Sequence, residues 1–276
     1  MTEVIYGQID TTGFGMKERL LMSAIINRDS VSVEWLISQG ADVNAKYFLT
    51  GDEKSPPLLT LACSTDRTGK IVSILLKAGA NVNDTNSSGG TPLMSACSER
   101  RNTDIIISEL LKAGANPNAR NKFGLTALMN ASEMGKVNAV KMLIQAGATV
   151  NEQTKTGETA LWKAVEDGNS EIVSLLLKAG ANSNAANEDG ITVLMNATSH
   201  FRTRNSRKSI LDSENINTIR ILLNSGANVN SKDKHGRTAL WLTEERLKDE
   251  IEHEKIQDVI LLRKQIIQIL KEHGAK

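Results

Sequence analysis

Residues 157–184 read GETALWKAVEDGNSEIVSLLLKAGANSN and contain the start and stop signals of two short helices. Thr159 is placed to cap a first helix, because its hydroxyl can accept hydrogen bonds from the open amides of the first turn. Apolar residues then recur at helical spacing in two segments, at Leu161, Ala164 and Val165 and at Ile172, Leu175 and Leu176. Gly180 is expected to end the second helix in the left-handed conformation that other residues resist. The stretch therefore predicts a short helix, a tight loop and a second helix.

The ending of this stretch, Gly-Ala-x-x-Asn, recurs along the chain. Its copies are Gly40–Asn44, Gly79–Asn83, Gly114–Asn118, Gly147–Asn151, Gly180–Asn184 and Gly226–Asn230. Successive glycines are 39, 35, 33, 33 and 46 residues apart, and His273-Gly274-Ala275 forms a truncated seventh copy. An offset signal, Gly-x-Thr before an apolar pair, occurs at Gly89–Thr91, Gly124–Thr126, Gly157–Thr159, Gly190–Thr192 and Gly236–Thr238. Repetition at this period predicts a solenoid of stacked helix pairs.

One copy of the offset signal carries a family resemblance. Thr91-Pro92-Leu93-Met94-Ser95-Ala96 is close to the T-P-L-H-x-A signature of ankyrin repeats, whose 33-residue period also occurs here. The resemblance runs from about Lys17 to the C-terminus. It implies an all-α ankyrin-repeat solenoid of about seven helix-turn-helix units, including atypical N- and C-terminal caps. We expect an N-terminal extension over residues 1–16 and a single domain over 17–276. The expected repeats span residues 17–46, 47–84, 85–119, 120–152, 153–185, 186–231 and 232–276.

The chain departs from the family pattern in two ways. The signature histidine is replaced by apolar residues that we expect to pack between repeats: Met94, Met129, Trp162, Met195 and Trp241. Three segments also lengthen the repeats, within residues 46–56, 199–213 and 244–258. In the last of these, Leu247 and Ile251 are expected to form the apolar edge of a charged helix. Insertions in solenoids often serve binding, but longer loops are also tolerated as surface drift, and both interpretations stay open.

Composition narrows the classes of function. The 33 Lys and Arg against 32 Asp and Glu leave a formal charge of +1, without the basic excess typical of a nucleic-acid binder. The N-terminus lacks a secretory pattern and no apolar run approaches eighteen residues, so we expect a soluble cytoplasmic protein without a membrane span. Cys63 and Cys97 occupy the same position of adjacent repeats. Packed helices lie about 8–10 Å apart, too far for a disulfide, so we expect both to be core residues.

No residue set for catalysis or metal binding stands out. The four histidines, His200, His235, His253 and His273, lack paired metal-ligand spacing. Neither a G-x-x-x-x-G-K-[ST] phosphate loop nor a G-x-S-x-G nucleophile elbow occurs. We therefore expect no enzymatic activity, no metal and no cofactor.

The resemblance places a protein partner on an extended concave surface made by the turn fingers and the exposed edges of the first helices. The candidate partner-binding residues are Tyr47, Phe48, Glu99, Lys122, Phe123, Leu125, Glu133, Met134, Lys155, Glu158, Glu166, Asp167, Asp189, His235 and Arg237. Phe123 and Leu125 on a finger tip, with Met134 nearby, resemble interface anchors, although single exposed apolar residues are also ordinary. Tyr47 and Phe48 form a second such pair, or fold back over the first repeat.

Charge along the first helices bears on the kind of partner. The expected row is acidic, at Glu99, Glu133, Glu166, Asp167 and Glu245. Such a row repels phosphate backbones and predicts a basic or mixed-charge protein partner. The insert at residues 200–209 is basic, which is typical of a solvated loop and compatible with nucleic-acid contact. The leading hypothesis is a monomeric, non-catalytic protein-interaction module. The alternatives are an inhibitor or antitoxin-like protein, a host-directed effector scaffold, and a nucleic-acid-binding factor that uses residues 200–209.

Overall fold

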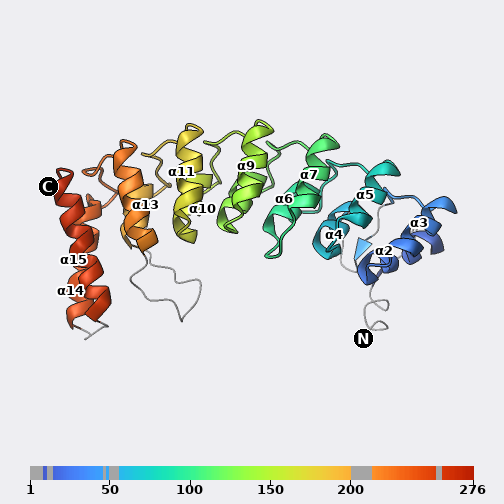
Figure 1. Cartoon of the computed structure of the whole chain (residues 1–276), viewed down its shortest axis with the longest axis horizontal. Coiled ribbons are helices and arrows are strands. Elements are labelled where there is room, and N and C mark those ends of the chain that lie inside the picture. The colour runs from blue at the N-terminus through green and yellow to red at the C-terminus, as the bar shows by residue number, and fades with distance from the viewer. Residues whose placement is uncertain (1–8, 11–14, 46–47, 50–55, 200–212, 253–256) are drawn as a thin grey trace. The chain divides into compact units, whose positions relative to one another are not determined.

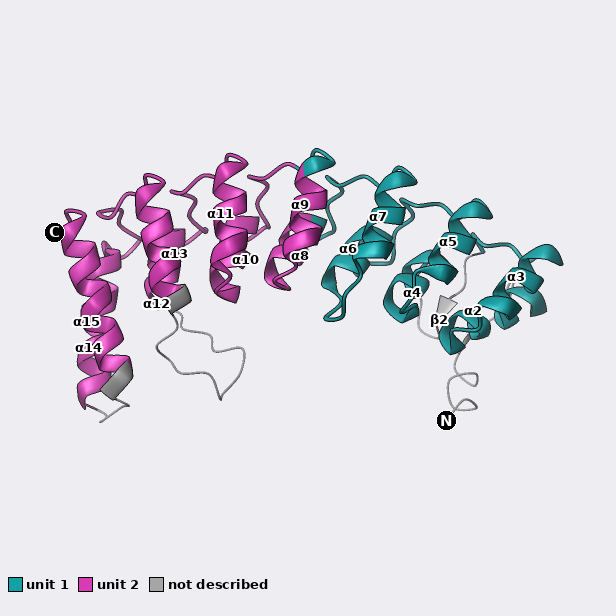
Figure 2. Cartoon of the chain, in the orientation of Figure 1, with its two compact units in different colours: residues 1–127, 145–148 teal, residues 128–144, 149–276 magenta. Residues whose placement is uncertain are grey.

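A computed structural model describes residues 9–10, 15–45, 48–49, 56–199, 213–252 and 257–276. These residues form helices α2 to α15 and two short strands, β1 (Ile9–Asp10) and β2 (Phe48–Leu49), which pair antiparallel. The chain divides into two compact units, residues 1–127 with 145–148 and residues 128–144 with 149–276 (Figure 2). Each unit is built from antiparallel helix pairs.

The first unit contains three complete helix pairs. They are α2 (Met16–Asn27) with α3 (Ser30–Ser38), α4 (Leu58–Thr65) with α5 (Lys70–Lys77), and α6 (Pro92–Ser98) with α7 (Asp104–Lys112). The first helices α2, α4 and α6 pack in a row, and the second helices α3, α5 and α7 pack in a parallel row (Figure 1). This is the stacking of helix pairs that the repeats predict.

The second unit continues the same arrangement. Its complete pairs are α10 (Ala160–Asp167) with α11 (Ser170–Lys178), α12 (Val193–Ser199) with α13 (Ser213–Asn224), and α14 (Ala239–Glu252) with α15 (Gln257–Glu272). The helices α8 (Ala127–Glu133) and α9 (Val137–Gln145) belong to this unit except for one residue each. In the part of the chain that is described, seven helix pairs confirm the predicted all-α repeat fold. The two-residue strands are the one addition.

Residues 157–184 form the two helices that their sequence predicts. Thr159 Oγ1 accepts a hydrogen bond from the amide of Trp162 at 3.2 Å, and Gly180 has a φ of +89° after the second helix. Four of the predicted core residues are at most 1% exposed: Leu161, Ala164, Ile172 and Leu176. Leu175 is only half-buried, while its neighbour Val173 is fully buried, so the second helix is turned by about one residue from the predicted face.

The asparagine of Gly-Ala-x-x-Asn ties each repeat to the next. Asn151 Nδ2 donates to the carbonyl of Gly180 at 2.9 Å, and its Oδ1 accepts from the amide of Asn182 at 2.8 Å. The same two bonds, to the next glycine carbonyl and to the amide two residues later, are made by Asn44, Asn83, Asn184 and Asn230. The truncated seventh copy is included, because Asn230 binds Gly274 and Lys276. The recurrent motif is therefore an inter-repeat clamp worth about 1 kcal/mol per bond.

The expectation that all five signature replacements pack between repeats is wrong for Trp241. Its side chain is 46% exposed, whereas the other four, Met94, Met129, Trp162 and Met195, are at most 5% exposed. Trp241 lies on α14, which among the described first helices packs against α12, so its ring is covered from one side.

The predicted apolar edge of the last charged helix is also wrong in part. Ile251 is 52% exposed and Leu247 is half-buried, while Glu250 is only 6% exposed. The cause is an ion pair: Arg263 of α15 is 2% exposed and its Nε lies 3.2 Å from Glu250 Oε1. Because Arg263 Nη1 also donates to the carbonyl of Thr198, this pair joins α14 and α15 to the end of α12.

Candidate partner-binding surface

Each of the five fully described fingers between repeats is closed by one polar side chain at its base. Asn121 Oδ1 accepts hydrogen bonds from the amides of Phe123 and Leu125, both at 2.9 Å. The equivalent residues, which accept from the amides two and four positions later, are Asn86, Thr154, Asn187 and Asp233. The finger tips are therefore held by local side-chain capping of the kind that favours Asn, Asp and Thr in turns.

Neighbouring fingers also bind each other through the backbone. In the first unit the amide of Lys122 donates to the carbonyl of Ser88 at 2.9 Å. In the second unit the amide of Glu188 donates to Thr156 at 3.1 Å and that of Lys234 to Asp189 at 2.9 Å. Within each unit, the tip residues are thus presented from a hydrogen-bonded frame.

The candidate residues on the fingers differ in exposure. Phe123 is 60% exposed, which is unusual for an aromatic residue on so constrained a turn. Leu125 is half-buried, so it is less open than Phe123. The charged or polar tips Lys122, Lys155, Asp189 and His235 are exposed. Phe123 is therefore the large apolar side chain that the described fingers of the first unit expose most.

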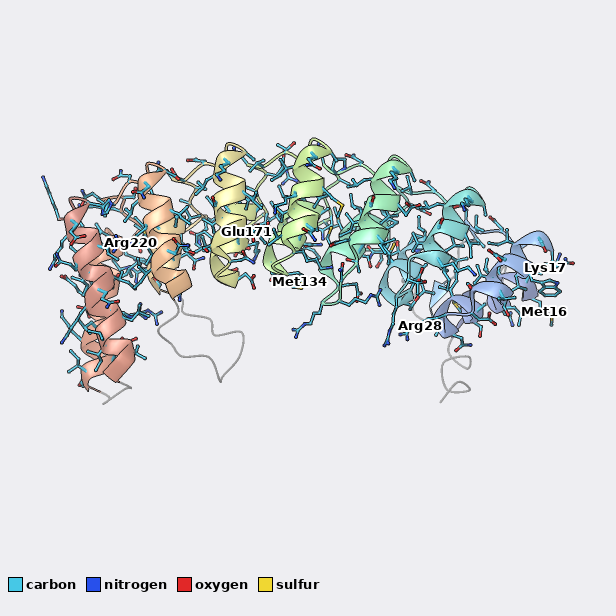
Figure 3. The ribbon with its side chains drawn as sticks, in the orientation of Figure 1. Met16, Lys17, Arg28, Met134, Glu171 and Arg220 are labelled. Carbon is cyan, nitrogen blue, oxygen red and sulfur yellow. The ribbon has the colours of Figure 1, made fainter. Side chains whose placement is uncertain are left out.

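The candidates on the first helices are only partly accessible. Half-buried positions include Glu99, Glu133, Met134, Glu166 and Asp167. Met134 follows α8 directly (Figure 3), and Glu99 forms the C-cap of α6. The helix edge therefore offers short, partly covered patches, in contrast to the open finger tips.

The expected acidic row is partly neutralised within the second unit. Lys163 Nζ lies 2.7 Å from Glu158 and 3.6 Å from Glu166, and its side chain is 12% exposed. Burial of Lys163 works against its charge, but the hydrogen bond to Glu158 and the attraction of Glu166 outweigh burial and raise its pKa. Glu245 likewise lies 2.7 Å from Lys248. The face of this unit therefore carries both signs of charge, which the spacing of acidic residues alone did not indicate.

Asp233 anchors the last finger through charged contacts. Its Oδ2 accepts from Arg237 Nε at 2.7 Å, and the guanidinium of Arg237 lies 5.9 Å from the ring centroid of Trp241. The Asp233 side chain is fully buried in this network. Burial works to raise its pKa, but the hydrogen bonds from Arg237 and His235 outweigh burial, so the pKa lies below its ordinary value. The finger thus holds Arg237 and Trp241 in a fixed arrangement.

Replacing Asp233 with alanine is expected to lower the free energy of unfolding by about 2–3 kcal/mol, because three hydrogen bonds to a buried carboxylate are lost. Asp233→Asn, which restores the residue used at Asn121 and Asn187, should cost about 1 kcal/mol. Since the folded-state pKa is lowered, the stability from the carboxylate is present above about pH 4 and lost as the pH falls through the folded pKa. Urea unfolding at pH 7 and pH 3 measures this; equal losses for both variants at pH 7 would contradict the capping role.

Two features near the surface were not predicted from the sequence. Trp241 is one. The other is an apolar group on the first helix pair, where exposed residues are Met16, Leu20, Val31 and Trp35. Leu20 is 50% exposed, whereas its neighbours on the same helix, Leu21, Ala24 and Ile25, are at most 7% exposed. A periodic pattern predicts which face of a helix is buried, but it does not predict whether another element covers the residues at the edge of that face.

Several predicted features lie outside the described residues or show no site. Tyr47, His200 and the basic insert over residues 200–209 lie outside them, and Phe48 is described only as backbone in β2. Cys63 and Cys97 are buried and form no disulfide in the described chain, and burial raises the pKa of the Cys63 thiol. Across the described ranges, no cluster of three His, Cys, Asp or Glu side chains could hold a metal ion. No described helix combines the length and apolar character needed to cross a bilayer.

Comparisons with known proteins agree with this geometry. The family described as Ankyrin repeats (3 copies) matches residues 21–121, 58–154 and 100–187. A search of curated protein sequences found no match. Among solved structures, the ankyrin repeat domain of Bcl-3, a member of the IkappaB protein family, is 27% identical, with a TM-score of 0.64 over 81% of this chain and 92% of that one. The human ASB11 ankyrin repeat domain is 22% identical, with a TM-score of 0.66 over 88% of this chain and 96% of that one. On the family match, which covers more than half of its length, the chain belongs to the ankyrin-repeat family.

Proposed function

We propose that the chain is a non-catalytic module that binds a protein partner through its fingers and the exposed edges of its first helices. Ankyrin-repeat domains are in general protein-interaction modules, and membership of the family supports this class of function. The observation that carries the placement is Phe123, an aromatic side chain 60% exposed on a finger held by two hydrogen bonds to Asn121. A rigid, exposed aromatic residue binds at low conformational-entropy cost and is a common interface anchor.

The charges of the second unit support a partner of mixed charge. Glu158 and Glu166 share Lys163, while Asp189 and Lys234 lie 3.8 Å apart on neighbouring fingers and remain largely exposed. Such alternating charges select a partner with both signs in complementary register, and give specificity more than raw affinity. A monomeric state and a cytoplasmic location remain proposals, as do the inhibitor, antitoxin-like and effector roles, which depend on the identity of the partner.

The double change Phe123→Ala with Met134→Ala is expected to weaken partner capture at least about tenfold, because each removes a side chain of the proposed interface. The thermal midpoint should hardly change, since Phe123 is exposed and Met134 is half-buried at the end of its helix. Quantitative affinity capture from a native lysate, read by mass spectrometry against wild type, measures the loss for each recovered protein.

Ile105→Ala provides the matched control. Ile105 is 64% exposed, a fraction similar to the 60% of Phe123. It lies on α7, which is a second helix and not part of a finger. Capture by this control should match wild type. If Ile105→Ala reduces recovery as much as the double change does, or if neither reduces it, the proposed surface is wrong.

A further inference from the structure

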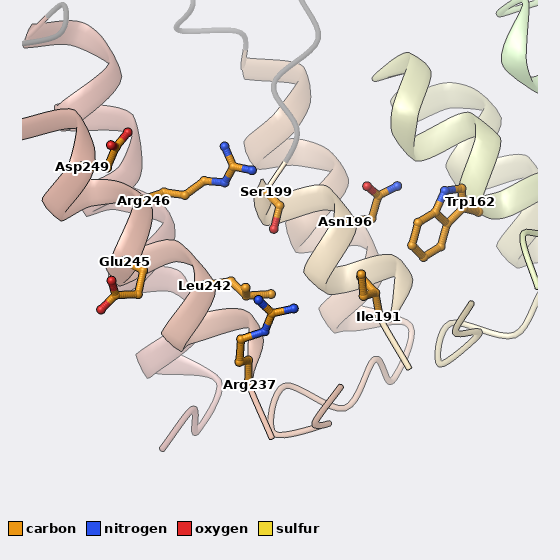
Figure 4. Close-up of a pocket in the computed structure, with 9 residues that line it drawn as sticks. All are labelled: Trp162, Ile191, Asn196, Ser199, Arg237, Leu242, Glu245, Arg246 and Asp249. Atoms are coloured by element: carbon orange, nitrogen blue, oxygen red, sulfur yellow. The ribbon is translucent and has the colours of Figure 1, made fainter. Parts of the chain in front are cut away.

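A pocket opens on the second unit between three first helices. Its volume is about 460 Å³, and α10, α12 and α14 line it together with the fingers that precede α12 and α14 (Figure 4). We call it the Asn196 pocket and define it by Trp162, Ile191, Asn196, Leu242, Glu245 and Arg246. The pocket lies on the fingers and first helices to which we assign partner binding.

Two side chains of this pocket have polar atoms without partners. Asn196 is 1% exposed and Trp162 is 5% exposed. Neither amide atom of Asn196 forms a hydrogen bond with any described residue, and the same holds for Trp162 Nε1. Leaving a buried donor or acceptor unpaired costs about 1–3 kcal/mol. This is an unfavourable arrangement for the isolated chain.

The repeat architecture does not require this asparagine. Counted from the capping threonine, the equivalent residue is Asn130 in α8, Lys163 in α10 and Leu242 in α14, and Asn130 has an interaction partner of its own. Lys163 is satisfied by Glu158 and Glu166, and Leu242 has no polar group to satisfy. Asn196 therefore stands out as a polar residue whose hydrogen-bonding groups the fold leaves unused.

The unused groups specify the chemistry of a ligand. Trp162 Nε1 can only donate, whereas the carboxamide of Asn196 both donates and accepts. A carboxylate would leave the Asn196 oxygen unpaired, and an ammonium group would leave the indole unpaired. A primary carboxamide offers one acceptor beside two donors and satisfies both residues.

The surroundings favour a neutral head group on an apolar stem. Ile191, Leu242 and the ring of Trp162 provide apolar wall. The charged lining residues Arg237 and Arg246 are balanced by Glu245 and Asp249, so the net charge of the pocket favours neither a cationic nor an anionic head group. Glutamine combines two methylene groups with a primary carboxamide. The amide atoms of Asn196 and Trp162 Nε1 have almost no exposed surface, so binding requires a turn of the Asn196 amide about its soft terminal torsion and a small shift of the Trp162 ring.

We propose that the Asn196 pocket accepts a glutamine side chain of the protein partner. This inference rests on the proposed function and makes it specific at one subsite. Pairing the buried groups of Asn196 and Trp162 on binding removes the desolvation penalty that the unbound chain carries.

The direct test is an NMR titration of the full chain with N-acetylglutamine N-methylamide. Saturable shifts are expected in the side-chain amide signal of Asn196 and the indole signal of Trp162, with a Kd of roughly millimolar for so small a probe. The indole signal is assigned by its loss in Trp162→Phe. The glutamate and norleucine analogues, which keep the backbone and the stem length, should bind at least about tenfold more weakly. Equal binding of norleucine would show a merely apolar pocket, and no shift with any probe would exclude the subsite.

The variant Asn196→Leu separates a binding role from a structural one. It removes the unpaired groups while keeping a similar volume, so the thermal midpoint is expected to stay constant or rise by a few degrees. Binding of the glutamine probe should be lost. A midpoint several degrees lower would mean that Asn196 stabilises the fold, and would overturn the proposal.

Failure of this subsite can be told from failure of the proposed function. The Phe123→Ala and Met134→Ala double variant should bind the glutamine probe as wild type does, because neither residue lines the pocket. If the probe fails to bind wild type while the double variant still loses its partner, only the subsite is wrong.

Discussion

Replacing Arg263 by methionine is expected to lower the free energy of unfolding by about 3–5 kcal/mol, because it leaves a buried carboxylate without its partner. Arg263 is 2% exposed, and its Nε contacts both oxygens of Glu250 at 3.2 and 3.3 Å. The change also leaves the carbonyl of Thr198, at the end of α12, without its guanidinium donor. Urea unfolding followed by circular dichroism measures the loss.

A double variant tests whether the loss comes from the unpaired charge. Glu250→Leu combined with Arg263→Met replaces the pair by apolar groups, and such replacements are often nearly neutral. We expect it to recover most of the stability that Arg263→Met loses. The exposed pair Lys248 and Glu245 serves as the control, since Lys248→Met should leave the urea midpoint nearly unchanged. A loss below 1 kcal/mol for Arg263→Met would contradict the assigned role of the buried pair.

The repeat units could be predicted because their signals are local. Thr159 and Gly180 act within one helix turn of the residues that they cap, and both behave as predicted. The asparagine of Gly-Ala-x-x-Asn was visible only as a recurrence; its reason is a clamp across 29 residues, from Asn151 to Gly180. The sequence shows that this asparagine recurs, but it does not show which residue of the next repeat the asparagine binds.

The exceptions arise where a residue depends on a distant or missing neighbour. Glu250 and Arg263 are 13 residues apart on two helices, so the charged helix pattern predicted Leu247 and Ile251 as the packed edge and did not indicate that Glu250 is buried in an ion pair. Trp241 follows the same local pattern as Trp162, yet Trp241 is 46% exposed and Trp162 is 5% exposed, a difference that the local pattern does not contain. The unpaired atoms of Asn196 are equally invisible in the sequence, because an asparagine at a buried helical position is ordinarily satisfied.

Candidate binding residues were predicted by position and not by environment. The period placed Phe123 and Lys155 on finger tips, and both are exposed. It also placed Glu158 on a finger and Glu166 in an acidic row along the first helices, but Lys163, which binds both, was assigned to no role. The sign of a surface depends on which side chains meet across a helix and a finger, and spacing along the chain does not give that.

Gly157→Ala is expected to destabilise the chain by about 2–4 kcal/mol and to separate two fingers. Gly157 has a φ of +83°, where an L-residue costs about 1–2 kcal/mol. A Cβ there would also lie 2.9 Å from Asn187 Cα and from the amide nitrogen of Glu188, so the backbone of the next finger must move. That amide donates to Thr156 at 3.1 Å, and its hydrogen exchange should therefore accelerate.

Gly236→Ala is the control that carries only the backbone cost of such a change. Gly236 has a φ of +75°, but an added Cβ would meet nothing within 4 Å, so only the conformational cost of about 1–2 kcal/mol applies. The difference between the two variants then measures how tightly neighbouring fingers pack. If it exceeds about 1 kcal/mol and the Glu188 amide exchanges faster only in Gly157→Ala, the fingers act as one frame that positions Lys155 and Glu158 for a partner. Equal losses with unchanged exchange would instead mean that each finger is held by its own capping residue alone.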